Sequence, residues 1–369
     1  MRDAAGLLDL HVPVIRLSNS LMPEVRWNTH LACLQRLCEA AQRGLDLVEV
    51  AGLTGLAFRT ALCTRATPAS LYHTWAREPY FRQWLDALGL DAEVSCHDAS
   101  LPSFDAWMAR QPAAVAAALE HGFPVLYWDN LAYGLVLGAG DGEFYISGIP
   151  AQVVHPLWQG HAAAGGLLSR LLEQHNAATL EAKAVAQEQL SPVLDNDALF
   201  VYVHGLGGFD AELAAARSLQ VAAGELSGRL VYPRILDNAS NVQAAEFGTA
   251  ALARWREEMK DGSVHAFGMI LNVQALAEAR RLGWQYLKRL PERLPASCTA
   301  RLQQACEFFE RIVTHWRDAQ AVFDVPLNVD TQMTRAGLEK CREAIYQVMQ
   351  TEQTAGRLLA GIAQELFEA

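Results

Sequence analysis

The sequence predicts an α+β protein with a mixed N-terminal part and a mainly helical C-terminal part. Short runs rich in Val, Leu, Tyr and Phe lie between residues 123 and 147, as is typical of strands. From about Asn241 onward, apolar residues instead recur every three or four positions, which is typical of amphipathic helices. A chain of 369 residues is long enough for two domains, and we place them at residues 1–155 and 156–369.

The first helices are predicted from caps and apolar spacing. Asn28 or Thr29 can cap a helix whose apolar residues recur at helical spacing and which ends at Gly44. The segment "PYFRQWLDAL" predicts a second helix that stops at Gly89, and a third, Ala-rich helix follows Pro112.

The strands come next along the chain. "FPVLYWD" and "YGLVLGAGDGEFYISGI" predict three strands, with a turn at residues 140–142 between the last two. "ALFVYVHG", residues 198–205, predicts one added strand within the second domain. The Gly-rich segment after it lacks the spacing of a dinucleotide-binding or P-loop motif, so we interpret it as a turn.

The remaining chain predicts a helical bundle or helical cap. Four segments after residue 241 carry apolar residues on one face and charges on the other. Pro291, Pro295 and Pro326 separate them, as expected of a residue that breaks helices.

Composition limits the classes of partner. The net charge is −11, and the acidic residues are spread along the chain without a block of Lys or Arg. This disfavours binding to nucleic acid or to anionic membranes and favours a small-molecule substrate or a protein carrier. No segment has the order of a signal peptide, and the apolar runs are too short to span a bilayer. We therefore expect a cytoplasmic protein.

The cysteines predict neither a disulfide framework nor a zinc site. Their number is odd and no C-x-x-C pair occurs, so we expect free thiols, no metal and no cofactor. The seven cysteines are Cys33, Cys38, Cys63, Cys96, Cys298, Cys306 and Cys341.

Several motifs together resemble a known family. They are the helix that contains Cys33, "AGLTGLAFR" at residues 51–59, G-x-P-V at 122–125, the hairpin "YGLVLGAGDGEFYI", and "FGTAALARW" at 247–255. These segments look like butirosin biosynthesis protein H and its relatives. The resemblance implies an N-terminal domain similar in fold to papain-like cysteine peptidases, followed by a helical domain.

The resemblance also implies acyl transfer through a cysteine thioester, from an acyl carrier protein to a small amine. Such chemistry needs a thiolate near a helix N-terminus and a His that an Asp or Asn orients. Cys33 is the candidate nucleophile, with His30 and Asp129 as candidate partners. The position of the usual catalytic His, at the start of the hairpin strand, falls on Ala132 or Tyr133.

Each candidate residue also has a structural interpretation. Cys33 could be a small buried residue of the core. Arg59 could bind a carboxylate or phosphate, or could pair with an acid to hold two domains together. Three aromatic residues could line a ligand pocket or pack in the core: Trp128, Tyr127 and Tyr133.

The leading functional hypothesis is therefore a thiol-dependent acyltransferase or amidase-like enzyme of specialised metabolism. It would act on a small amine or a carrier-bound acyl group. The alternative is a non-catalytic papain-like descendant that binds a small molecule or a protein partner in a cleft between the domains. A third hypothesis is a homodimer formed through the helical domain.

Overall fold

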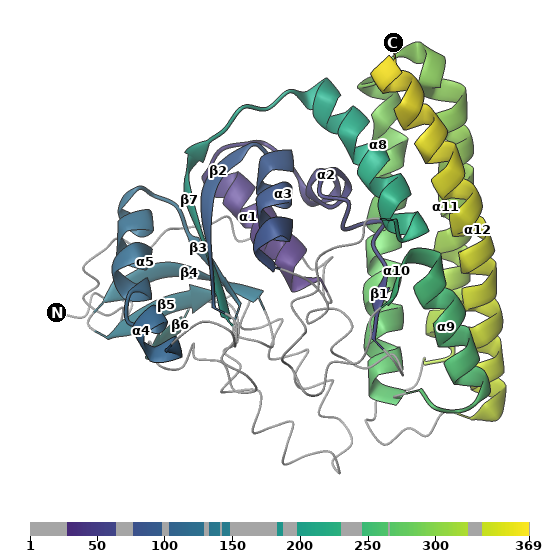
Figure 1. The fold of residues 1–369 in the computed structure, drawn as a ribbon, viewed down its shortest axis with the longest axis horizontal. Helices are drawn as coiled ribbons and strands as arrows, with labels where there is room; N and C mark the ends of the chain where they lie inside the picture. The colour runs from purple at the N-terminus through teal and green to yellow at the C-terminus, as the bar shows by residue number, and fades with distance from the viewer. Residues whose placement is uncertain are drawn as a thin grey trace. The chain divides into compact units, whose positions relative to one another are not determined.

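The computed structural model of the chain describes two compact units (Figure 1). Unit 1 comprises Met1–Leu45 and Arg77–Gly208, and unit 2 comprises Asp46–Ala76 and Phe209–Ala369. The residues that the structure describes are 28–63, 77–97, 103–128, 133–140, 142–147, 183–186, 198–229, 246–264, 266–323 and 334–368.

The two units are not the contiguous segments 1–155 and 156–369 that the sequence suggested. The strand at 198–206 hydrogen-bonds to strands of unit 1, although we expected it in the helical domain. The helix at 47–53 packs against helices of unit 2, although it precedes most of the sheet in sequence. Both differences arise from pairing between segments far apart in the chain.

Unit 1 is built on a six-stranded antiparallel sheet in the order β2-β7-β3-β4-β5-β6. The strands are β2 (Leu90–His97), β3 (Val125–Trp128), β4 (Tyr133–Gly140), β5 (Glu143–Ser147), β6 (Lys183–Ala186) and β7 (Ala198–Leu206). The predicted strands at 123–128, 134–147 and 198–205 are confirmed. The sequence analysis did not predict β2, although its apolar residues alternate with the polar Asp91 and Glu93, as is typical of a half-buried strand.

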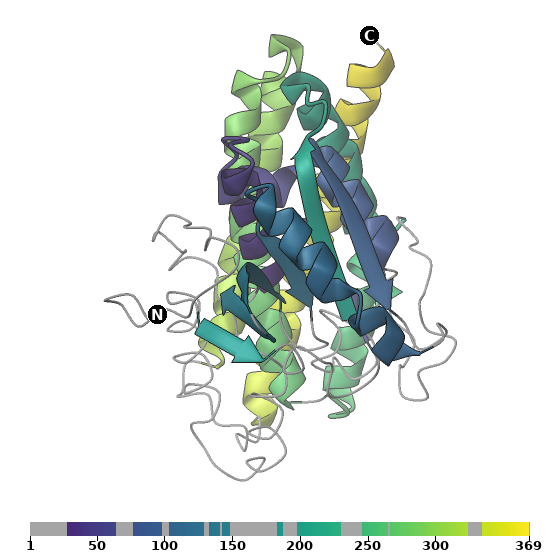
Figure 2. The ribbon, with the colours of Figure 1, turned by 90° about the vertical axis from the view of Figure 1, so that its left-hand side faces the viewer.

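Helices cover both faces of this sheet (Figures 1 and 2). They are α1 (Thr29–Ala40), α3 (Arg77–Ala87), α4 (Phe104–Met108) and α5 (Gln111–Glu120). On one face, α1 contacts β3 and β4 while α3 contacts β2; on the other, α5 contacts β3, β4 and β7. The three predicted helices of this region are confirmed, and Gly89 and Gly122 follow two of them with φ of 62° and 85°.

The core of unit 1 under α5 follows from strand alternation. Tyr127 in β3 and Phe200 and Tyr202 in β7 belong to one buried cluster with Val115 and Leu119 of α5. Neighbouring residues of the same strands face α1 and α3, because successive side chains point to opposite faces of a sheet.

Unit 2 is mainly helical, as predicted for the C-terminal part. Its helices are α2 (Leu47–Leu53), α8 (Ala211–Ser227), α9 (Gly248–Lys260), α10 (Ala266–Arg289), α11 (Thr299–Ala321) and α12 (Arg335–Glu368), with short 3-10 turns η4 (Leu290–Glu292) and η5 (Ala296–Cys298). A two-stranded pairing joins β1 (Ala61–Leu62) to β8 (Glu246–Phe247). Pro291 and Pro295 lie in the turns between α10 and α11, whereas Pro326 lies outside the described residues.

In unit 2, α12 contacts α8, α9 and α11, and α10 contacts α2 and α11. In the described parts of the chain, no helix combines the length and apolar character needed to cross a membrane.

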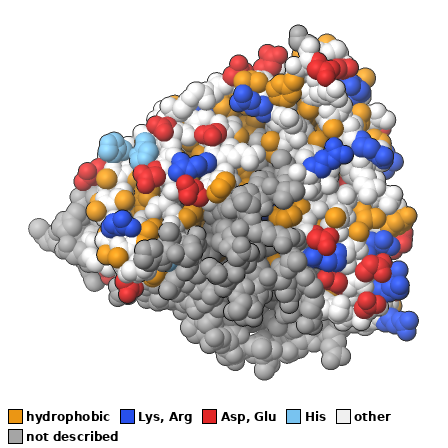
Figure 3. Space-filling model, viewed as in Figure 1, with side chains coloured by type: hydrophobic (Ala, Val, Ile, Leu, Met, Phe, Trp, Pro, Cys, Tyr) orange, Lys and Arg blue, Asp and Glu red, His pale blue; other side chains and the backbone are white. Residues whose placement is uncertain are grey.

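On the face drawn in Figure 3, acidic and basic side chains lie interspersed rather than gathered by sign. This distribution agrees with the spread of acidic residues along the sequence.

Candidate functional site

The N-terminal end of α1 meets the start of β4. Asn28 is the N-cap of the helix, and Thr29 is its first residue. The backbone N–H of Tyr133, the first residue of β4, donates a hydrogen bond to Oγ1 of Thr29 at 3.3 Å. The resemblance places the usual catalytic His at Ala132 or Tyr133, and Tyr133 carries a phenol in place of an imidazole.

Cys33 lies one turn further into α1 and is buried, with 6% of its surface exposed. Burial raises the pKa of the Cys33 thiol to about 12, and the positive charge of Arg36 opposes this rise only in part. Arg36 itself is buried and forms an ion pair with Glu39 on the next turn. The thiol is therefore protonated at neutral pH, whereas the nucleophilic form of cysteine is the thiolate.

His30 lies in an aromatic environment at the same end of α1. Its ring stacks on Trp84 of α3 with a centroid separation of 6.0 Å and meets the edge of Tyr133 at 5.6 Å. Only 5% of the His30 surface is exposed. His30 and Cys33 are three residues apart and so share one side of α1.

The sheet brings together two of the three aromatic candidates. Trp128 and Tyr133 are paired across β3 and β4, and their rings stack with centroids 6.0 Å apart. Tyr127 points to the opposite face of the sheet, into the cluster under α5. Asp129 and Ala132 lie outside the described residues. The structure thus groups His30, Trp128 and Tyr133, and separates Tyr127 from them.

Arg59 belongs to unit 2, whereas the other described candidates belong to unit 1. Its side chain is buried, with 6% exposed, and its carbonyl accepts a hydrogen bond from Nη1 of Arg280 at 2.9 Å. The segment that precedes it needs its two glycines. A Cβ on Gly52 would lie 2.1 Å from the ring of Tyr286, and Gly55 has φ of 78°. A side chain at either position would therefore meet a clash or an unfavourable backbone conformation.

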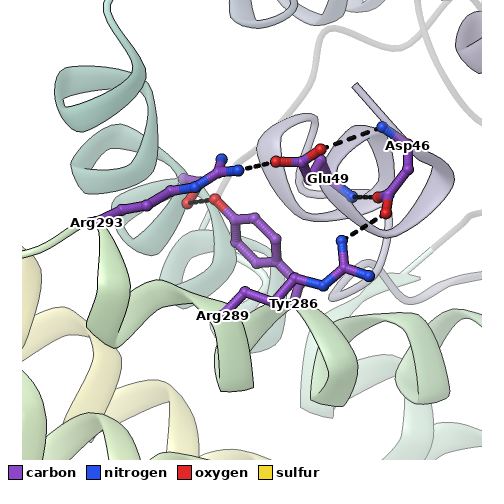
Figure 4. A network of polar contacts seen from close by, with 6 residues as sticks. Asp46, Glu49, Tyr286, Arg289 and Arg293 are labelled. Carbon is purple, nitrogen blue, oxygen red and sulfur yellow. Dashed lines mark hydrogen bonds and ion pairs between the residues drawn. The ribbon is translucent and has the colours of Figure 1, made fainter. Parts of the chain in front are cut away.

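A polar network fixes α2 in unit 2 (Figure 4). Asp46 and Glu49 form a capping box at the start of α2. The same two carboxylates accept hydrogen bonds from Arg289, at 2.6 Å to Asp46, and from Arg293 to Glu49. Nearby, the hydroxyls of Tyr286 and Ser218 lie 2.8 Å apart. Every carboxylate in this network has a cationic partner, which indicates a structural role.

Two further residues lie at this end of α1 beside His30 and Tyr133, and the sequence did not indicate their place there: Thr29 and Trp84. From the sequence, Thr29 was expected only as a helix cap. Its position at the first turn of the helix was the available signal. Trp84 gave no signal of its own, because only the packing of α3 in the fold brings its ring to His30.

No protein-family model matches this chain, and no curated protein matches its sequence. In its described residues, the chain is an α+β protein in which helices cover the six-stranded antiparallel sheet of unit 1, while unit 2 is mainly helical.

Proposed function

We propose that this chain is a non-catalytic relative of papain-like acyltransferases and acts by binding a small molecule or a protein partner. The observation that carries the proposal is the protonated, buried thiol of Cys33. We also propose that the protein is cytoplasmic and that it binds neither nucleic acid nor a membrane. It can further form a homodimer.

The residues at the start of α1 and β4 support the same proposal. Oγ1 of Thr29 accepts the backbone N–H of Tyr133, so this hydroxyl is engaged in joining helix to strand. A phenol ordinarily has a pKa near 10 and is a poor general base at neutral pH. The aromatic rings around His30 also place apolar surface at the position where acyl transfer would need groups that donate and accept protons.

Site-resolved alkylation tests the proposal. The folded chain is treated with iodoacetamide across a series of pH values, and each cysteine is quantified by peptide mass spectrometry. We expect Cys33 to react more slowly than the less buried Cys96 and Cys306. Labelling of Cys33 ahead of the other six cysteines, with a midpoint below about pH 8.5, would contradict a non-catalytic role.

Thiol-dependent acyl transfer, or an amidase-like reaction on a small amine, is the second proposal. It is favoured by the packing of α1, the helix that contains Cys33, against β3 and β4 of the sheet. Incubation with an acyl carrier protein that bears a thioester would then add the acyl mass to Cys33, and the Cys33→Ala variant would not acquire it. Absence of this adduct in the unmodified chain would rule out the second proposal.

A further inference from the structure

A groove of about 970 Å³ lies in unit 2 between α8 and α12. Figure 1 shows that these two helices run in opposite directions, so the C-terminal end of α8 lies beside the central part of α12. Leu226 and Gly356 meet there, since a Cβ on Gly356 would lie 3.4 Å from Cβ of Leu226. Pockets that bind small molecules have volumes in this range.

Two arginines line the groove where α8 ends. Arg229 directly follows the helix, and its backbone N–H donates to the carbonyl of Gly224, which folds the chain back against the last turn. Arg357 follows Gly356 in α12. Both side chains are exposed, and within the described residues neither guanidinium has a hydrogen bond or an ion pair. Two accessible cations therefore lie at this end of the groove.

The groove continues from the arginines toward the C-terminal end of α12, past small and apolar side chains. They are Ala223 and Gly224 of α8 and Ala360, Ala363 and Phe367 of α12. Phe367 is 47% exposed, although it is a large hydrophobic residue. An apolar group that covers these side chains would remove their surface from water, which is favourable.

Two carboxylates in the lining do not cancel the charge of the arginines. Glu352 is fully buried and forms an ion pair with Arg280 at 2.6 Å. Glu368 accepts a hydrogen bond from the amide of Gln364 and lies about 16 Å beyond Arg357 along the helix. This separation exceeds the screening length of about 8 Å at physiological salt. One end of the groove is therefore positive, in a chain whose net charge is −11.

We propose that this groove binds a small amphiphile, whose anionic head pairs with Arg229 and Arg357 and whose apolar tail extends toward Phe367. The head is a carboxylate or a phosphate ester, because the planar guanidinium donates parallel hydrogen bonds to the oxygens of either group. From Arg357 to Phe367 the helix rises about 15 Å, which gives the length available to the tail. The proposal does not depend on the state of Cys33, which belongs to unit 1.

Eight-carbon ligands with different head groups test the charge of the site. The probes are octanoate, octyl phosphate, 1-octanol and octylammonium, and calorimetry measures their binding to the full chain at neutral pH. We expect the preferred anion to bind at least about tenfold more tightly than octanol, because a hydrogen bond to a charged group is the stronger one. Octylammonium should bind most weakly.

The two anionic probes also distinguish a carboxylate head from a phosphate head, since the tighter of them identifies the group that the arginines prefer. The proposal is overturned if octanol binds as tightly as both anions, if octylammonium binds more tightly than octanol, or if none of the probes binds.

Charge variants locate the head group. Arg229→Gln and Arg357→Gln should each weaken binding of octanoate by about threefold to tenfold, and the double variant should bind it no more tightly than octanol. Arg317→Gln is the matched control. Arg317 of α11 is exposed, has no ion pair within the described residues and does not line the groove. Equal weakening in the control and the groove variants, or no weakening at all, would overturn the site.

A series of chain lengths tests the tail. From butanoate to hexanoate to octanoate the head stays the same, and affinity should rise by up to about fourfold for each CH2 group that is buried. Ala360→Phe fills the groove and should weaken binding of octanoate more than that of butanoate. Ala300→Phe, at an exposed position of α11 outside the lining, should change neither. Equal affinities along the series would mean that the arginines bind any anion, and would overturn the groove as the binding site.

Discussion

Tyr133 and Thr29 connect β4 to α1 through a hydrogen bond from the Tyr133 backbone N–H to Oγ1 of Thr29, 3.3 Å long. The two residues are 104 positions apart in the chain. The contact brings the first turn of α1 to the first residue of β4, and the candidate nucleophile Cys33 lies one turn further along the same helix. It makes Thr29 a residue that positions the strand.

Thr29→Ala should lower the free energy of unfolding by about 1 kcal/mol, because the N–H of Tyr133 loses its acceptor. Thr29→Ser keeps the hydroxyl oxygen and should lie closer to the unmodified protein. Urea denaturation of both variants measures the difference. Equal loss in the two variants would mean that the methyl group, rather than the hydrogen bond, stabilises this junction.

Alkaline pH should destabilise the fold through its buried thiols. Burial raises the pKa of Cys33 and of Cys38 from the ordinary value of 9.0 to about 12, so folded thiols keep protons that the unfolded chain releases. The unfolded state binds fewer protons between these values, and stability therefore falls as pH rises above about 9. The slope is about 1.4 kcal/mol per pH unit for each such group.

Urea denaturation under reducing conditions at about pH 8 and pH 10 measures this loss. Cys33→Ala removes one of the titrating thiols, so its stability should fall less steeply with pH than that of the unmodified chain. The comparison cancels the titration of Lys and Tyr residues that both proteins share. Parallel pH profiles would contradict the raised pKa of Cys33.

Gly52→Ala should destabilise unit 2, because its Cβ would lie 2.1 Å from the ring of Tyr286 and overpack the contact between α2 and α10. The cost expected for such overpacking is about 1–3 kcal/mol. Gly361→Ala is the control, since that glycine is also helical and its Cβ meets open space. Thermal unfolding should show a lower midpoint for Gly52→Ala alone. A raised midpoint would mean that the Tyr286 ring moves aside at little cost.

The ion pair of Arg280 and Glu352 should be sensitive to the loss of one partner. Both side chains are fully buried, so Glu352→Ala leaves the guanidinium without its carboxylate and should cost about 3–5 kcal/mol. The double variant Arg280→Met with Glu352→Leu removes both charges and should be less destabilised than Glu352→Ala. Chemical denaturation compares them, and a double variant no more stable than the single one would mean that the bonds of Arg280 to residues 57–60 dominate.

The sequence by itself determined the secondary structure of most described segments. Helical spacing, capping residues and glycines predicted α1, α3 and α5, and runs of apolar residues predicted β3, β4, β5 and β7. These signals are local, because a cap or a turn depends on residues a few positions apart. β2 also carries a local signal, because Leu90 and Val94 are buried while Asp91 and Glu93 are exposed, although the sequence analysis did not use it.

Only the tertiary structure decided which segments lie together. β7 pairs with β2 and β3, and Arg280 bonds to residues 57–60 more than 200 positions earlier. The tertiary structure also placed Trp128 beside Tyr133, whereas Tyr127 lies on the other face of the sheet. It buried Cys33 deeply enough to keep the thiol of this residue protonated. Burial and proximity depend on contacts between segments far apart in the chain, and the spacing of residues along one segment carries no record of them.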